Sequence, residues 1–164
     1  MRRRLLFAAA TLASLALGIL VGEQGIDQLR ASHVLRAVEL RTASALRGGP
    51  GAATIVIQNV AALRTIAALD PAEVGIPVAL GSQYLVLGRY DSAIGAYEQA
   101  LRLEIRPETY LNLGRALLGA DRRSEALSAF ERAVLLSPRL ESELGEEVRA
   151  EVAQRVRARL EARP

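Results

Sequence analysis

The side chains that most often carry catalysis or bind metals are scarce in this sequence. His33 is the only histidine and there is no cysteine, so neither a histidine cluster nor a thiolate site for a metal is available. A Ser-His-Asp triad would have to use His33, which is better explained as a surface or interhelix histidine. The sequence therefore predicts no catalytic residue, no metal site and no cofactor, and we expect a protein that is not an enzyme.

A group of glutamates near the C-terminus comes closest to a set of paired acids and bases. It consists of Glu141, Glu143, Glu146 and Glu147. General acid-base chemistry needs two carboxyl groups whose environments separate their pKa values. Here arginines follow on the same predicted helix, so we expect a solvated, charged face. The acids lie early and the arginines late in this helix, which suits the helix dipole.

Phosphate and nucleic-acid binding are also disfavoured. The glycine-rich run at residues 48–51 would need a following lysine to hold a phosphate, and the chain contains no lysine. We interpret this run as a connector between helices. The arginines are spread along the chain among 18 acidic residues, and aromatic residues make up only 4% of it. No nucleic-acid partner is expected.

A pattern of small and large apolar residues is written twice between residues 74 and 138, at a spacing of 33 residues. The first copy contains Leu80, Gly81, Tyr84, Ala93, Tyr97 and Ala100, and the second contains Leu113, Gly114, Leu117, Ala126, Phe130 and Ala133. A period of this length indicates stacked helical hairpins. Because glycine within a helix costs about 1 kcal/mol relative to alanine, we expect Gly81 and Gly114 to meet the backbone of the paired helix near Ala93 and Ala126.

This pattern resembles the tetratricopeptide repeat, and Pro138 supplies the closing proline of the second copy. The first copy departs from the family at Ile105, and the usual early tryptophan is replaced by Pro77 and Tyr110. The resemblance implies an all-α solenoid whose first helices present a concave face to peptides or partner proteins. In this chain that face would consist of Val78, Ser82, Leu85, Leu111, Arg115 and Leu118. Alternatively, the same six residues pack against neighbouring helices.

The rest of the chain divides around these repeats. We expect an anchor at residues 1–22, a helical region with a degenerate repeat at 23–73, repeats at 74–106 and 107–139, and a capping helix at 140–164 that begins near Pro138. Residues 23–47 are predicted to form a helix, because apolar residues recur at roughly helical spacing with arginines between them, at Ile26, Leu29, Val34, Leu35, Val38 and Leu46. Asp91 and Ser124 are expected to cap the second helices of the two good repeats.

The N-terminus reads as a membrane segment. Residues 2–4 are arginines, and an uninterrupted apolar run follows at residues 5–21. Its 17 residues would span about 25 Å as a helix, the lower limit for crossing a bilayer. An uncleaved signal anchor is favoured. A cleaved signal peptide with its site near Ala16 and Gly18, and a twin-arginine export signal, remain open.

Arginine placement predicts the orientation, because residues 2–4 adjoin the apolar run and acids come first on its other side. The N-terminus is then cytoplasmic and the repeats lie on the periplasmic or extracytoplasmic side. Small residues recur every fourth position within the run, at Ala10, Ser14, Gly18 and Gly22. Such a stripe allows two membrane helices to pair.

Two functions fit these features. The first is a membrane-tethered scaffold or adaptor that binds a protein or peptide partner in the cell envelope. The second is a self-assembling subunit that forms homo-oligomers through its anchor and its solenoid face. An exported soluble repeat protein, released by signal cleavage, is a further alternative.

Overall fold

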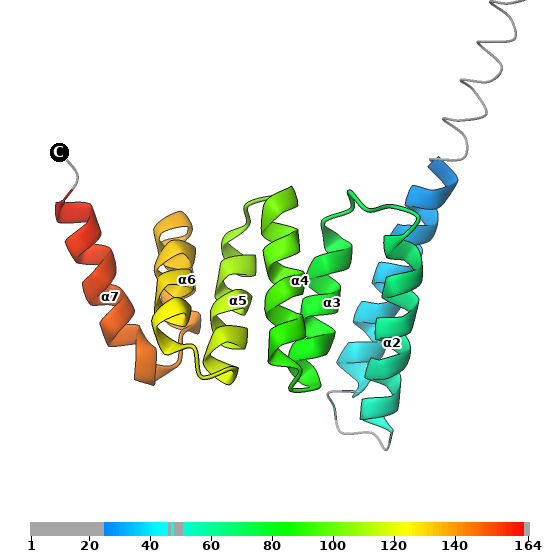
Figure 1. The fold of residues 1–164 in the computed structure, drawn as a ribbon, viewed down its shortest axis with the longest axis horizontal. Coiled ribbons are helices and arrows are strands. Elements are labelled where there is room, and N and C mark those ends of the chain that lie inside the picture. The colour runs from blue at the N-terminus through cyan, green and yellow to red at the C-terminus, as the bar shows by residue number, and fades with distance from the viewer. Residues whose placement is uncertain (1–24, 46, 48–50, 163–164) are drawn as a thin grey trace, which may run out of the picture.

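The computed structural model describes residues 25–45, 47 and 51–162, and each regular element in this part of the chain is helical. The first helix covers residues 25–45. It is followed by α2 (Ala52–Ala67), α3 (Gly75–Val86), α4 (Tyr90–Leu103), α5 (Pro107–Gly119), α6 (Arg123–Leu136), the 3₁₀ helix η1 (Pro138–Glu143) and α7 (Glu146–Glu161). Figure 1 shows them standing side by side in a row, with residues 25–45 near one end and α7 at the other.

The helices form hairpins that stack in chain order. Helix α3 packs against α4 and α5 against α6, while α4 meets α5 and α2 meets α3. The first helices of the two good repeats, α3 and α5, also touch each other. A chain in which each hairpin contacts only its neighbours is a solenoid. The all-helical, tetratricopeptide-like prediction is therefore confirmed, and a third hairpin of residues 25–67 lies in front of the two good repeats.

The two repeat glycines make room for aromatic rings. A Cβ at Gly81 would lie 2.6 Å from Cε1 of Tyr97, and the ring of Phe130 occupies the same place over Gly114. Both rings are almost completely buried. The expectation that these glycines meet backbone near Ala93 and Ala126 was wrong, because the aromatic side chain of the paired helix reaches back to cover them.

The turns inside the two good hairpins share one backbone conformation. Gly88 has φ 66° and Asp121, which is 33 residues later, has φ 59°. This left-handed conformation ends α3 and α5 and redirects the chain into the next helix. The residues before α4 and α6 are Arg89 and Arg122, neither of which makes a side-chain cap. The predicted caps Asp91 and Ser124 lie inside the first helical turn instead.

The helix of residues 25–45 carries apolar residues on two opposite sides. Ala31 and Val38 are buried against α2 and α3 in a small cluster with Leu63, Ile66 and Ile76. Ile26, Leu29 and Leu40 point to solvent, the last two with 63% and 66% of their surface exposed. The predicted helix is thus confirmed over residues 25–45, but Ile26 and Leu29 of its apolar positions face solvent, and Leu46 lies outside the described residues. We call Ile26, Leu29 and Leu40 the outer stripe.

The C-terminal cap is not one continuous helix. The chain forms η1 at Pro138–Glu143, is extended at Leu144, and begins α7 at Glu146. This break buries Leu140 and Leu144 against the last hairpin, and Val148 and Val152 continue the same contact from α7. The start expected near Pro138 is correct for a helix of the 3₁₀ type, but the long capping helix begins eight residues later.

The predicted anchor of residues 1–22, with the small-residue stripe inside it, lies outside the described residues. Among the helices that the structure does describe, none is long and apolar enough to cross a bilayer.

Candidate functional site

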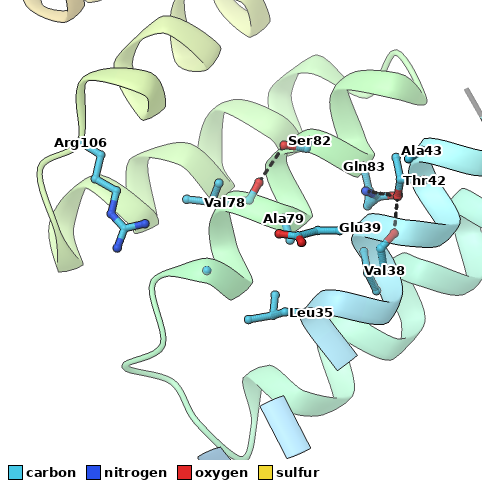
Figure 2. Close-up of a pocket in the computed structure, with 11 residues that line it drawn as sticks. Leu35, Val38, Glu39, Thr42, Ala43, Val78, Ala79, Ser82, Gln83 and Arg106 are labelled. Atoms are coloured by element: carbon cyan, nitrogen blue, oxygen red, sulfur yellow. Dashed lines mark hydrogen bonds between the residues drawn. The ribbon is translucent and has the colours of Figure 1, made fainter. Parts of the chain in front are cut away.

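A pocket opens at the seam between the first hairpin and α3, and we call it the seam pocket. Its volume is about 460 Å³. Figure 2 shows that the helix of residues 25–45 forms one wall, α3 forms the other, and Arg106 approaches from the loop before α5. The lining residues are Leu35, Val38, Glu39, Thr42, Ala43, Gly75, Val78, Ala79, Ser82, Gln83 and Arg106.

The start of α3 lies close to the first hairpin. A Cβ at Gly75 would lie 3.0 Å from Cδ1 of Leu35 and 3.0 Å from Oε1 of Glu73, so a side chain at this position would require these two side chains to shift. The backbone N–H of Gly75 donates a hydrogen bond to Oε1 of Glu73 at 2.9 Å. This bond satisfies one of the N–H groups that a helix start leaves without a partner. Leu35, Val78 and Ala79 then form an apolar floor.

A buried polar network closes the inner end of the pocket. Thr42 Oγ1 donates to the carbonyl of Val38 at 2.8 Å and accepts from Asn59 Nδ2 at 3.1 Å and from Gln83 Nε2 at 3.0 Å. Asn59 Nδ2 also donates to Gln83 Oε1 at 3.3 Å. Asn59 and Gln83 are buried, whereas Oδ1 of Asn59 accepts no hydrogen bond among the described residues. The network links the helix of residues 25–45 to α2 and α3. Because hydrogen bonds are directional, it fixes the relative positions of these three helices more narrowly than apolar packing alone would.

Ser82 connects the pocket to the repeat core. Its hydroxyl donates to the carbonyl of Val78 at 3.1 Å, so the hydroxyl of Tyr97, 3.2 Å away, must be the donor in the second bond. Burial raises the pKa of Tyr97, while the bond to Ser82 and the charge of Arg115 lower it to a smaller extent. Tyr97 therefore stays a neutral hydrogen-bond donor at physiological pH.

Two charged side chains line the pocket, and they differ in how they are compensated. Arg106 forms an ion pair with Glu104 at 2.5 Å. Its pKa is raised by the hydrogen bond to Glu104, and Glu73 and Glu108 add to the increase through their charge. Glu39 is exposed and forms no ion pair within the described part of the chain. The uncompensated charge of the seam pocket is therefore negative.

The six residues that were predicted to form one groove differ in their burial and in their partners. Val78 and Ser82 do line the seam pocket. Leu111 is only 2% exposed and belongs to the main core. Its assignment to a groove was wrong, because the first helix of an inner repeat contacts hairpins on both of its sides and buries both.

The other three predicted groove residues have partners within the protein. Leu85 and Leu118 are half-buried against the main core. Arg115 bonds to Asn112 Oδ1 at 3.0 Å and to the Glu143 carbonyl at 3.3 Å, and its guanidinium lies 3.7 Å from the Glu143 carboxylate. Arg115 thus fastens η1 to α5 and is not among the residues that line the seam pocket.

Five of the pocket residues that the sequence-based reasoning missed come from the first hairpin, and the others are Gly75, Ala79, Gln83 and Arg106. Leu35, Glu39 and Thr42 lie on a helix that lacks the Leu-Gly signature, so the repeat pattern did not mark its concave side. The available signal was Asn59, a polar residue at the position where the good repeats carry Ala93 and Ala126. A polar side chain at such a tight crossing requires buried hydrogen-bond partners from adjoining helices.

The seam pocket can bind an apolar group of a ligand next to a charged one, which suits non-covalent binding. A concave site with an apolar floor and a few placed polar groups is typical of ligand and peptide pockets. Within the described residues, no three metal-binding side chains lie close enough to share an ion.

Comparisons with known proteins give one family match and two similar solved structures. The family model described as bacterial transcriptional activator domain matches residues 20–158. The crystal structure of MamA is similar with a TM-score of 0.54 and 20% sequence identity, covering 80% of this chain and 83% of that chain. The type III secretion translocator chaperone SycD of Yersinia enterocolitica gives a TM-score of 0.49 and 19% identity, covering 75% of this chain and 91% of that chain. No curated protein matches. The likeness to MamA shows the fold, a solenoid of helical hairpins.

Proposed function

The chain belongs to the bacterial transcriptional activator domain family, and from that premise we propose that it is a non-catalytic protein-interaction module. The seam pocket is the docking site for a segment of a partner protein. The observation that carries this proposal is the apolar pocket of about 460 Å³ between the first hairpin and α3. Its lining residues all lie inside residues 20–158, the part of the chain that the family model matches.

A protein partner is supported over a nucleic acid by the way the arginines are used. Arg122 pairs with Glu125, Arg123 with Glu151 and Arg139 with Glu108. A neighbouring carboxylate reduces the positive charge that each of these arginines would present to a phosphate. We therefore propose that any part this module takes in transcriptional control, as the family description suggests, is through contact with another protein.

We further propose that residues 5–21 tether the module to a membrane. The matched region begins at residue 20, where this apolar run ends, which supports treating the run as a separate segment. The arginines at residues 2–4 favour a cytoplasmic N-terminus, and the module would then face the extracytoplasmic side. Its partner on that side is an envelope protein.

The topology can be tested cleanly because the chain has no cysteine. A Ser128→Cys variant would carry one thiol on an exposed part of α6. We expect a membrane-impermeant maleimide to label it in intact spheroplasts to the same extent as in lysed ones. Labelling only after lysis would place the module in the cytoplasm, and the envelope partner would have to be abandoned in favour of a cytoplasmic one.

The docking site is tested by site-specific photocrosslinking in the native cells. A photoreactive amino acid at Ala43, on the rim of the seam pocket, should crosslink to one defined partner. The same amino acid at Ser128, on a different hairpin, should not. Equal crosslinking from both positions, or none from Ala43, would contradict the assignment of the pocket.

A second candidate function is self-assembly, and the outer stripe favours it. Ile26, Leu29 and Leu40 lie in line on the solvent side of the first helix, and exposed apolar patches often mark interfaces. Sedimentation of the full chain in detergent, compared with a Leu29→Glu/Leu40→Glu variant, separates the two functions. A wild-type oligomer that dissociates in the variant supports self-assembly, and a monomer in both supports the scaffold.

A further inference from the structure

The seam pocket combines an apolar floor with one uncompensated carboxylate. Leu35, Val78 and Ala79 supply the floor, and Glu39 stands beside them with its side chain directed over α3 (Figure 2). A ligand that fills the floor must therefore bring its polar part past Glu39.

The positive charge of Arg106, at the other end of the pocket, does not neutralise the negative charge of Glu39. Arg106 is held by Glu104 at 2.5 Å. Glu73 and Glu108 also lie close enough to Arg106 to raise its pKa. The charge of Arg106 is thus offset by its own acidic neighbours, and Glu39 remains the pocket charge that forms no ion pair among the described residues.

We propose that the seam pocket recognises a partner segment in which an arginine or lysine adjoins an apolar side chain. The apolar side chain fills the floor between the first hairpin and α3, and the cation forms an ion pair with the Glu39 carboxylate. This proposal rests on the proposed docking function of the same pocket and adds the chemistry of its ligand. Charge complementarity of this kind sets which partner binds more than how tightly it binds.

The contributions of the apolar floor and of Glu39 to the binding free energy can be measured separately. Burial of the ligand's apolar side chain lowers the binding free energy by the same amount whatever charge lies next to it. The neighbouring charge decides between attraction and repulsion at Glu39. Binding of two peptides that differ only in that charge therefore isolates the Glu39 contribution.

The experiment uses the full chain in a nonionic detergent and two fluorescent peptides with blocked ends. One peptide alternates leucine with arginine, and the other alternates leucine with glutamate at the same length. Fluorescence anisotropy gives a Kd for each. We expect the basic peptide to bind at least about tenfold more tightly than the acidic one, a ratio typical of a hydrogen bond to a charged group. Glu39→Gln should bring the ratio close to one, and Glu39→Arg should invert it.

Glu98→Gln provides the matched control, because Glu98 is an exposed acid on α4 outside the pocket. It should leave the ratio unchanged, and adsorption of the basic peptide to the micelle would affect all variants alike. An unchanged ratio in Glu39→Gln would overturn the proposal.

Two further outcomes have distinct meanings. If both peptides bind equally to the wild type and Val78→Arg weakens both, the pocket is a docking site without charge selection. The proposed function then stands and this inference fails. The chain also has its own basic and apolar stretch at residues 2–7. A tighter fit of the basic peptide after changing Arg2, Arg3 and Arg4 to serine would identify that stretch as the occupant and overturn the assignment to a partner.

Discussion

At the scale of single residues, the two repeat glycines are positions where a missing Cβ decides where an aromatic ring lies. Gly81 and Gly114 each carry a buried ring in the space that a side chain would need. Glycine lowers helix propensity by about 1 kcal/mol, and the ring contact offsets that cost. Each repeat therefore contains a glycine and, sixteen positions later, the aromatic residue whose ring packs on it.

The glycine positions give a direct stability prediction. Gly114→Ala should destabilise the protein by about 1 to 3 kcal/mol, because its methyl group would overpack the Phe130 ring. Gly95→Ala is the matched control, since a Cβ there meets no atom within 4 Å. It should stabilise α4 by about 0.5 to 1 kcal/mol. Urea unfolding of both variants measures the difference, and a Gly114→Ala protein as stable as wild type would contradict the ring contact.

The two left-handed turn residues allow a reciprocal test. Asp121 adopts φ 59°, which is costly for a residue with a Cβ, so Asp121→Gly should stabilise the protein by about 0.5 to 1 kcal/mol. Gly88→Ala at the equivalent position should destabilise it by about 1 kcal/mol. Thermal unfolding would show a rise in Tm for the first and a fall for the second. Shifts of the same sign would rule out the shared turn conformation.

At the scale of elements, the sequence predicted the repeating hairpins better than the surfaces between them. The 33-residue register located α3 to α6, since the positions that repeat are those buried at tight helix crossings. It could not tell which side of a first helix stays open, and Leu111 was misplaced for that reason. The same limit hid the seam pocket, because the helix of residues 25–45 carries no repeat signature and its partner contacts depend on a buried network around Asn59.

The crossing within the second hairpin gives a prediction at this scale. Ala126 is completely buried between α5 and α6. Ala126→Leu should push these helices apart and cost about 1 to 3 kcal/mol. Arg122→Ala removes an exposed ion pair with Glu125, and because solvent screens such a pair, its loss should change stability far less than Ala126→Leu. Equal stability of the two variants in denaturant would mean that Ala126 does not lie at the crossing.

The contact between η1 and α5 predicts a dependence on pH. The pKa of Glu108 is lowered by its own backbone N–H at the start of α5 and then by Arg139 of η1. A carboxyl whose pKa is depressed by folding stabilises the protein above its unfolded pKa, and this contribution is lost as pH falls through its folded pKa. Glu108→Gln should therefore make stability less sensitive to acid below about pH 4.5. Glu98→Gln is the control, and an identical acid limb for Glu108→Gln and wild type would exclude the effect.

At the scale of the whole molecule, the two ends of the solenoid are built differently. The C-terminal end is closed by η1 and α7, which bury Leu140, Leu144, Val148 and Val152 and turn charged residues outward. The opposite end leaves the outer stripe exposed and lies next to the seam pocket. Under the proposed function, a partner would bind between the first hairpin, which is the least regular repeat, and α3 of the first regular repeat.

The most direct measurement of this account is the yield of the photocrosslink from Ala43 in two variants of the full chain. Val78→Arg places a charge on the floor of the seam pocket, whereas Arg115→Ala changes a residue outside the pocket that belongs to the groove implied by the repeat resemblance and also removes the contact of α5 with η1. We predict that Val78→Arg abolishes the crosslink while its melting temperature stays close to that of wild type, and that Arg115→Ala retains it. Loss of the crosslink in Arg115→Ala with retention in Val78→Arg would contradict the account and place the docking surface on α5.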